Sequence, residues 1–364
     1  MAVLPFGLAA AFAACSDATT TEVASRSDGG SKSDASFPTD DAGAALPGLT
    51  ARGILLVHAA SVPPLRVCFG GRPDLPPLPV DPDAKMPESN VVGLDVGSVV
   101  RLPNVAGALG QVYAFPEAEL RKQVKADGGD TYACRDLVSS STFGASGMRF
   151  GEVSGDLSTG LHLVALTGCE SAQRDPTASA ARCGADWTAG AGNLTAVHAP
   201  LRAARRNAPM RMPVQVVQLS PSLEARAATR PLAFGVDPDE GTSEGALVGL
   251  FPFGVPAPAE PEEIALPIED AGAFATTNLV VDVVTEADAG RERVLSQTLA
   301  ETQRLTLPGT IPPAFFASIS SFLVLTLGDV EAPPDAGDPR SRLHLLAVPL
   351  AIPSAADASA DESL

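Results

Sequence analysis

The chain has 364 residues, 45% of them hydrophobic, which is enough for two domains of ordinary size with substantial cores. It carries 43 acidic and 25 basic residues, a formal net charge of -18 at pH 7. Phosphate backbones and anionic lipid surfaces repel such a chain, so we do not expect nucleic acid as a partner.

Residues 1–15, MAVLPFGLAAAFAAC, form an apolar run that ends in small residues and a cysteine. The run is shorter than the roughly twenty residues that cross a bilayer and is typical of a signal peptide. Its end, from Phe12 to Cys15, resembles the bacterial lipobox, although Phe12 replaces the usual leucine. The resemblance implies lipidation at Cys15 and a protein anchored to a membrane. The alternatives are an ordinary secretory signal and an apolar tail without such a role.

The segments that flank the central part of the chain are polar and rich in small residues. Residues 16–48 contain many Ser, Thr, Asp and Gly residues and few large apolar ones, so they are expected to form a disordered tether. Residues 353–364 form a similar acidic tail. The folded body is therefore expected between residues 49 and 352.

Short apolar stretches separated by Pro, Gly and Asp run through this body. Their Val and Leu content and their turn-rich flanks predict a mainly β fold. The clearest stretches are residues 53–58, 65–69, 161–167, 214–219, 278–284 and 342–348. Two segments favour a helix instead. Residues 116–124 have Pro116 at a first helical position and Glu117 one turn before Arg121, and residues 291–303 are the second segment.

The sequence also indicates an internal duplication. VDPDAKMPESNVVGL at 80–94 and VDPDEGTSEGALVGL at 236–250 share both ends at equal spacing. Further blocks match in the same order: 54–61 with 214–221, 116–119 with 285–288, 162–169 with 322–329, and 194–201 with 343–350. Their shared order predicts two tandem repeats, residues 49–205 and 206–352.

The basic stretch between the repeats contains Arg202, Arg205, Arg206 and Arg211. A phosphate could bind there, but the acidic composition of the rest of the chain favours a different interpretation. We expect a connector that packs against acidic domains.

The ends of two predicted strands carry a family resemblance. Val57-His58-Ala59-Ala60-Ser61 and Leu219-Ser220-Pro221 resemble the Val-His-Ala-Ser-Pro strand end of the bacterial domain of unknown function 4397 family. The first segment has one extra alanine, and the second keeps only the ending. The resemblance implies immunoglobulin-like β-sandwiches, often in tandem, in secreted or lipid-anchored proteins. It supplies no catalytic residues.

Residues Gly241 to Gly245 fit the G-x-S-x-G frame around a hydrolase serine, here Ser243. A nucleophile elbow needs a helix directly after the serine, whereas the next residues, ALVGLFPFGVPAPAEP, are rich in Gly and Pro. Only His344 follows as a possible base. We therefore interpret the segment as a loop between two strands.

Alternating carboxylates could begin a calcium-binding loop at Asp81 and Asp83 and at Asp237 and Asp239. Neither segment completes an EF-hand, and Asp followed by Pro is also the favoured start of a type I turn, which is our preferred interpretation. The histidines at 58, 162, 198 and 344 lie in predicted strands without metal-type spacing. We therefore expect neither a metal nor a cofactor.

Four cysteines, Cys68, Cys134, Cys169 and Cys183, all lie in the first repeat. In an exported protein they are expected to form two disulfides, for which three connectivities are possible. Cys169 and Cys183 bracket a polar loop, and closing it would contribute about 3 kcal/mol in the chain-entropy model. We predict a Cys169–Cys183 bond, which leaves Cys68 and Cys134 to pair by elimination.

These observations predict a lipid-anchored, non-enzymatic protein of the cell envelope or surface. Two tandem immunoglobulin-like β-sandwiches would serve as a structural or binding module, with the identity of any protein or glycan partner left open. The alternative is an exported hydrolase or a calcium-dependent carbohydrate-binding protein. A pocket that joins a serine or a carboxylate pair to a histidine would favour the enzyme.

Overall fold

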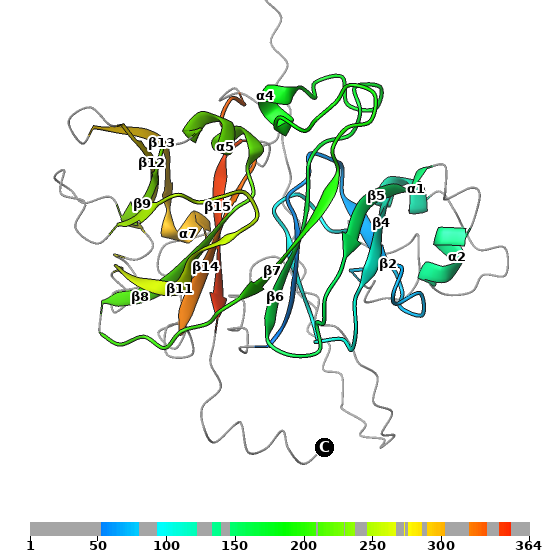
Figure 1. Ribbon diagram of the computed structural model, residues 1–364, viewed down its shortest axis with the longest axis horizontal. Helices are drawn as coiled ribbons and strands as arrows, with labels where there is room; N and C mark the ends of the chain where they lie inside the picture. The colour runs from blue at the N-terminus through cyan, green and yellow to red at the C-terminus, as the bar shows by residue number, and fades with distance from the viewer. Residues whose placement is uncertain are drawn as a thin grey trace, which may run out of the picture. The chain divides into compact units, whose positions relative to one another are not determined.

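A computed structural model describes most of the chain between Arg52 and Leu350 (Figure 1). The described residues are 52–79, 93–121, 133–139, 146–208, 210–228, 230–236, 246–266, 273, 276–285, 290–302, 320–332 and 342–350. The predictions for the signal peptide, Cys15, the tether and the acidic tail lie outside these ranges.

The described part is mainly β, as the sequence predicts. The strands before residue 202 are β1 Gly53–His58, β2 Leu65–Phe69, β3 Val99–Leu102, β4 Gly110–Pro116, β5 Met148–Val153, β6 Leu161–Thr167 and β7 Thr195–Leu201. The later strands are β8 Arg211–Gln218, β9 Leu232–Val236, β10 Leu247–Gly249, β11 Pro256–Ala265, β12 Asn278–Val284, β13 Arg291–Thr298, β14 Ser321–Leu327 and β15 His344–Leu350. The helices are short: α1 Glu117–Arg121, α2 Cys134–Ser139, α4 Ala180–Cys183, α5 Pro221–Ala227 and α7 Leu299–Thr302.

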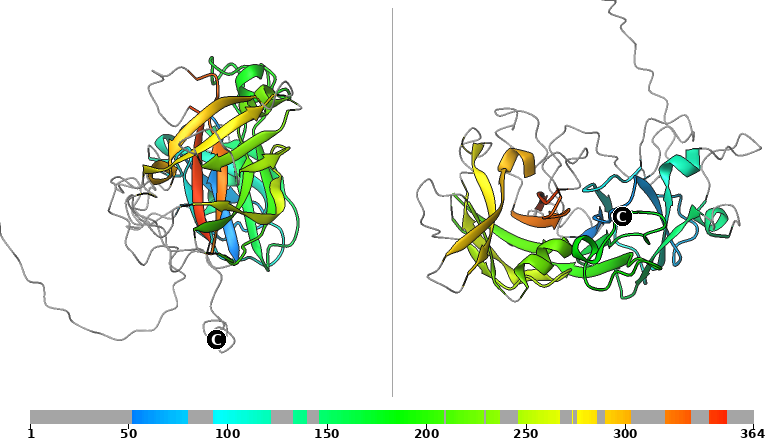
Figure 2. Two further views of the ribbon diagram at one scale, coloured as in Figure 1. Left: turned by 90° about the vertical axis from the view of Figure 1, so that its left-hand side faces the viewer. Right: turned by 90° about the horizontal axis from the view of Figure 1, so that it is seen from above.

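The strands form two sets of sheets (Figures 1 and 2), and their orders correspond except that the second set has one further edge strand, β10. In residues 53–201, a sheet of order β3-β1-β6-β7 accompanies a sheet of order β2-β4-β5. In residues 211–350, the orders are β11-β8-β14-β15 and β10-β9-β12-β13. The first-named sheet of each set has a parallel central pair, β1 with β6 and β8 with β14, and antiparallel outer pairs.

The register of these sheets agrees with the blocks that match within the sequence. The corresponding pairs are Ile54↔His162 and Val214↔Phe322 on the central strands, and His162↔Pro200 and Phe322↔Pro349 on the next strands. Three pairs of matching blocks therefore occupy equivalent places in the two sheets. Most of the matching segments 80–94 and 236–250 lies outside the described residues.

Three hydrophobic cores explain why the central strands lack an alternating pattern. Ile54 and Leu56 of β1 face a core shared with β2, β4 and β5, and the second set encloses an equivalent core. Leu55 and Val57 point the other way, into a third core that we call the junction core. Its buried members come from both sets of sheets: Leu55, Val57, Leu161, Leu163, Ala165, Leu201, Val217, Leu219, Leu323, Leu325, Leu327, Leu346, Val348 and Leu350. Strands buried on both faces are continuously apolar.

Residues 291–303 do not form the predicted helix. Arg291–Thr298 is strand β13, and only Leu299–Thr302 is helical. The strand pairs with β12, where the buried carboxylate of Asp282 lies 2.5 Å from Arg293 Nε and 3.9 Å from Arg291 Nη1. Pairing with a neighbouring strand thus overrides the local helix preference.

The helix predicted at residues 116–124 begins one residue later than expected. Pro116 is the last residue of β4, and helix α1 runs from Glu117 to Arg121. Glu117 accepts a hydrogen bond from Arg66 Nε of β2 at 2.5 Å, and both side chains are almost fully buried. Arg66 also donates to the carbonyl oxygen of Pro79. The glutamate thus joins the helix to the sheet through an ion pair that the sequence pattern does not reveal.

The connector between β7 and β8 contacts the second set of sheets through Arg202. Its guanidinium lies 2.5 Å from Glu260 of β11, and its backbone N–H donates to Gln215 of β8. The side chains of Arg202 and Glu260 are both exposed, so this ion pair lies at the surface.

Candidate functional site

A cavity of about 290 Å³ lies where the ends of four central strands meet. Apart from Val96, which precedes β3, the residues that line it follow β1 and β6 in the first set and β8 and β14 in the second. The full lining is Ala59, Ala60, Ser61, Val62, Pro63, Val96, Gly168, Cys169, Arg182, Pro221, Gly328 and Asp329. Both segments that carry the family resemblance contribute to this lining. We call the space the junction cavity.

Glycines at equivalent positions shape the cavity. Gly168 follows β6 with φ 91°, and Gly328 follows β14 with φ 83°. A Cβ atom at Gly168 would lie 2.4 Å from the carbonyl oxygen of Asn193, and one at Gly328 would lie 2.1 Å from that of Arg342. Only glycine combines this backbone conformation with so close an approach of a second chain segment.

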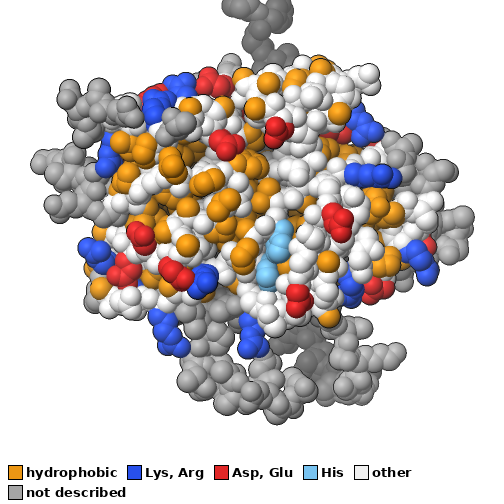
Figure 3. Space-filling model, in the orientation of Figure 1, with side chains coloured by type: hydrophobic (Ala, Val, Ile, Leu, Met, Phe, Trp, Pro, Cys, Tyr) orange, Lys and Arg blue, Asp and Glu red, His pale blue; other side chains and the backbone are white. Residues whose placement is uncertain are grey.

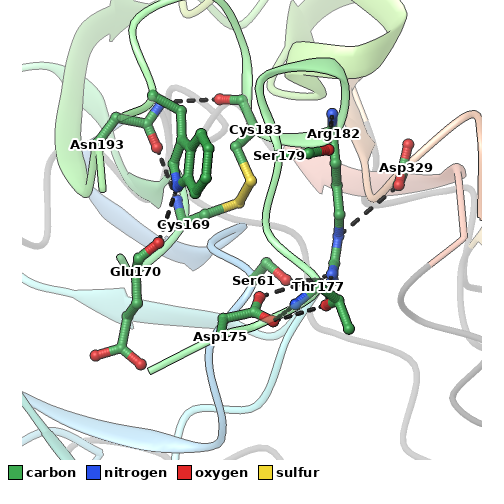
Figure 4. The surroundings of a disulfide bond; sticks show 11 residues. Ser61, Cys169, Glu170, Asp175, Thr177, Ser179, Arg182, Cys183, Asn193 and Asp329 are labelled. Carbon is green, nitrogen blue, oxygen red and sulfur yellow. Dashed lines mark hydrogen bonds and ion pairs between the residues drawn. A yellow bond between two sulfur atoms is a disulfide. The ribbon is translucent and has the colours of Figure 1, made fainter. Parts of the chain in front are cut away.

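Arg182 lines the cavity, and Figure 4 shows its side chain beside Ser61, Thr177, Asp175 and Asp329. It lies on α4, whose N-cap Ser179 accepts a hydrogen bond from the backbone N–H of Arg182. The guanidinium donates to Ser61 Oγ and to Thr177 Oγ1, both at 2.5 Å. It also lies 3.6 Å from Asp175 and 3.8 Å from Asp329, so it links the loop after β6 to both sets of sheets.

A disulfide holds α4 in place. Cys169, two residues after the end of β6, is bonded to Cys183, the last residue of α4. The side chain of Asn193 accepts from the backbone N–H of Cys169 at 2.9 Å and donates to the carbonyl of Cys183 at 2.7 Å. Trp187 packs against the disulfide, and its indole N–H donates to the carbonyl of Glu170. The arginine is therefore presented from a fixed loop.

The charges around the cavity limit what it can bind. Two carboxylates, those of Asp175 and Asp329, lie near one guanidinium, and all three side chains are at least three-quarters buried. An anionic ligand would therefore meet a balanced or negative wall rather than a free arginine. Ser61 and the peptide groups offer neutral hydrogen bonds, and the remaining lining is mostly apolar.

The two predicted disulfides are present. Cys169 pairs with Cys183, and Cys68 of β2 pairs with Cys134 of α2. The calcium candidates Asp81, Asp83, Asp237 and Asp239 and the serine candidate Ser243 lie outside the described residues. Within the described ranges, no group of three or more His, Cys, Asp or Glu side chains could hold a metal ion.

All four histidines lie in strands, as predicted, but their surroundings differ. His58 is fully buried, and its Nδ1 lies 2.9 Å from the carbonyl oxygen of Leu94. Burial lowers the pKa of His58 to about 4, although the bond to Leu94 opposes this effect. His344 Nδ1 hydrogen bonds to the carbonyl of Arg342. His58 and His344 are absent from the lining of the junction cavity.

Sequence reasoning missed a contact between the other two histidines. His162 on β6 and His198 on β7 are 36 positions apart, yet their ring nitrogens lie 3.2 Å from each other. The register of the β6–β7 pair places Val164 opposite His198 and His162 opposite Pro200. Knowledge of this register would have predicted the contact, whereas spacing along one strand could not.

Comparisons with models of protein families, with curated proteins and with solved structures found no match for this chain. Among the helices of the described ranges, none is long and apolar enough to cross a bilayer.

Proposed function

We propose that this protein is an exported, lipid-anchored module of the cell envelope that binds a small ligand without transforming it. Its body would consist of two tandem immunoglobulin-like β-sandwich domains. The corresponding sheet orders and the matching strand registers support the duplication. The parallel central pair of each domain differs from the two antiparallel sheets of an immunoglobulin domain.

Two disulfides support a location outside the reducing cytoplasm, because such bonds form and persist in oxidising compartments. The apolar segment before Cys15 and the polar segment after it support attachment through a lipid on that cysteine. The protein would then attach to the membrane through this lipid, and a tether would connect the lipid to the folded body.

The junction cavity is the observation that carries the binding role. Both domains contribute their strand ends to it, and its walls combine apolar side chains with the hydroxyl of Ser61. Sites for small ligands commonly have apolar walls and a few fixed polar groups. We infer a small, largely apolar ligand with a neutral hydroxyl or amide group, since Asp175 and Asp329 balance Arg182.

A fragment screen by ligand-observed NMR on the mature chain tests this function. Neutral fragments that pair an apolar ring with a hydroxyl or amide should bind, and Val96→Trp should abolish binding by filling the cavity. Val248→Trp is the matched control, because Val248 is 54% exposed and is not part of the lining. Circular dichroism and melting temperature verify that both variants fold. Equal binding to the wild type and the Val96 variant would refute the assignment.

A separate experiment tests the anchor. Mass spectrometry of protein extracted from membranes should find a diacylglyceryl group on Cys15, and Cys15→Ser should release the protein into the soluble fraction. An unmodified mature protein whose distribution does not change with Cys15→Ser would contradict lipidation while leaving the cavity untested.

A further inference from the structure

The two histidines in contact form a second candidate site that is independent of the junction cavity. His162 Nδ1 lies 3.2 Å from His198 Nε2, and the ring centroids are 5.3 Å apart with an interplanar angle of 32°. His162 is 8% exposed and His198 is half-buried. Histidine side chains reach the surface on the face drawn in Figure 3, where they lie beside hydrophobic side chains. Solvent can reach the pair because the side chain of His198 is only half-buried.

The hydrogen bonds of His162 indicate which nitrogen of each ring carries the proton. His162 Nε2 lies 2.7 Å from the carbonyl oxygen of Thr159, which can only accept, so Nε2 is the protonated nitrogen. Neutral imidazole has a single N–H, so His162 Nδ1 presents a lone pair. The hydrogen bond between the rings therefore has His198 Nε2 as its donor and His162 Nδ1 as its acceptor.

Neutral imidazole can carry its proton on either ring nitrogen, so moving the His198 proton to Nδ1 would leave two lone pairs that face one cation. A metal ion about 2.0–2.1 Å from both nitrogens would bind them at an angle of about 100°, close to the tetrahedral value. Histidines that bind metals characteristically donate their outer N–H to a carbonyl or carboxylate, as His162 does here. The arrangement thus has both the spacing and the outer hydrogen bonding of a pair of metal ligands.

We propose that His162 and His198 bind one divalent first-row transition metal ion, of the zinc or nickel class, through their inward-facing nitrogens. Imidazole suits these ions, and the remaining coordination positions would be open to water or an external ligand. The net charge of -18 attracts cations, and Asp156 acts electrostatically on His162.

A proton competes with the metal for the same lone pairs. Binding should weaken as the pH falls, because the ligands must be unprotonated.

Isothermal titration of the chelator-stripped mature chain with Zn²⁺ at pH 7.5 tests the proposal. We expect one saturable site, weakened at least tenfold by His162→Gln and by His198→Gln. His344→Gln is the matched control and should bind like the wild type, because His344 lies on β15 and bonds to Arg342. Equal titrations of the wild type and His198→Gln, or no binding at millimolar Zn²⁺, would overturn the proposal.

Nitrogen-15 NMR of the imidazoles provides a second readout that does not depend on a variant. In the metal-free chain, Nε2 should be the protonated nitrogen of both rings. Zinc should move the His198 proton to Nδ1 and shift the two facing nitrogens, while Nε2–H of His162 stays in place. Spectra that do not change on addition of Zn²⁺ would exclude the site, even if zinc binds weakly to carboxylates elsewhere.

Discussion

The two halves of the body, residues 53–201 and 211–350, have corresponding sheet orders but different means of stabilising them. The first half has both disulfides and a buried ion pair between Arg66 and Glu117. In the second half, the buried Asp282 pairs with arginines that are more than a quarter exposed. The difference indicates that apolar strands determine the sheet order, while the layers outside the sheets can vary.

The turns that follow the equivalent strands β8 and β1 are also stabilised in different ways. In the second half, Ser220 caps helix α5 by accepting from Leu223 N–H and donates to the carbonyl of Gly328. In the first half, the corresponding turn at Ala60 and Ser61 is held by Arg182 from the disulfide loop. Cys169 in one half takes the place that Asp329 has in the other. Arg182 pairs with this Asp329, so the two differently stabilised turns are in contact at the junction cavity.

The largest difference in stability between the two halves is expected when their buried ion pairs are broken. Glu117→Ala leaves Arg66 buried beside a cavity, and breaking a buried pair in this way costs about 3–5 kcal/mol of the free energy of unfolding. Asp282→Ala should cost about 1 kcal/mol, because Arg291 and Arg293 remain hydrated. Urea denaturation at pH 7 measures both losses. Equal losses would mean that burial of the ion pair does not distinguish the two halves.

The strands could be predicted because each apolar run is long enough to be recognised from the sequence alone. Residues 53–58, 65–69, 161–167 and 278–284 have the predicted limits. It failed at residues 291–303, where the β12 partner outweighs the local preference. The composition of β6 and β14 also predicts that both strands are buried along their whole length. It does not predict that the junction core covers their outer faces.

The candidate sites were less accessible to prediction. The disulfide partners followed from loop length and elimination, and the polar groups of the junction cavity did not follow from any local pattern. Arg182 meets Ser61 across 121 positions and Asp329 from the other half. Such contacts depend on how the two sheet sets pack, which no single stretch encodes. The His162–His198 contact likewise depends on strand register.

The next contrast lies between the disulfides of the first half. In the chain-entropy model, Cys68–Cys134, with a sequence separation of 66, contributes about 4 kcal/mol, and Cys169–Cys183, with a separation of 14, contributes about 3 kcal/mol. We expect both double alanine variants to be destabilised in that order in urea. Only the second should also loosen the junction, seen as faster amide exchange at Ser61 and Asp329. Slow exchange there in both variants would argue against a clamping role.

The junction core tests whether the halves unfold together. Val57 and Val217 occupy equivalent positions, are both fully buried and both belong to that core. Val57→Ala and Val217→Ala should each cost about 2 kcal/mol, from the lost apolar contact and the space left behind. Calorimetry should show one transition that shifts equally in the two variants. Two separate transitions, each moved by one variant only, would indicate domains that unfold independently.

The smallest effect at neutral pH is expected from His58, whose counterpart in the second half is Gln218. Gln218 donates to the carbonyl of Ser220 and accepts from its N–H. In contrast, His58 Nε2 finds no hydrogen-bond partner within the described ranges. The ordinary pKa of 6.5 applies to unfolded His58, and burial lowers the folded value to about 4. As the pH falls from 6.5 towards 4, the unfolded chain takes up the proton first, so stability declines.

This decline amounts to about 2 kcal/mol at pH 5, since each pKa unit corresponds to about 1.4 kcal/mol. His58→Gln should remove it, because glutamine can donate to the carbonyl of Leu94 and does not titrate. The difference in unfolding free energy between this variant and the wild type should therefore grow in favour of the variant from pH 7 to pH 5. The acidic side chains affect both proteins alike, so the difference isolates the histidine. His344→Gln is the control and should follow the wild type. A constant difference across this pH range would mean that His58 accepts its proton in the folded chain, contrary to its burial against Leu94.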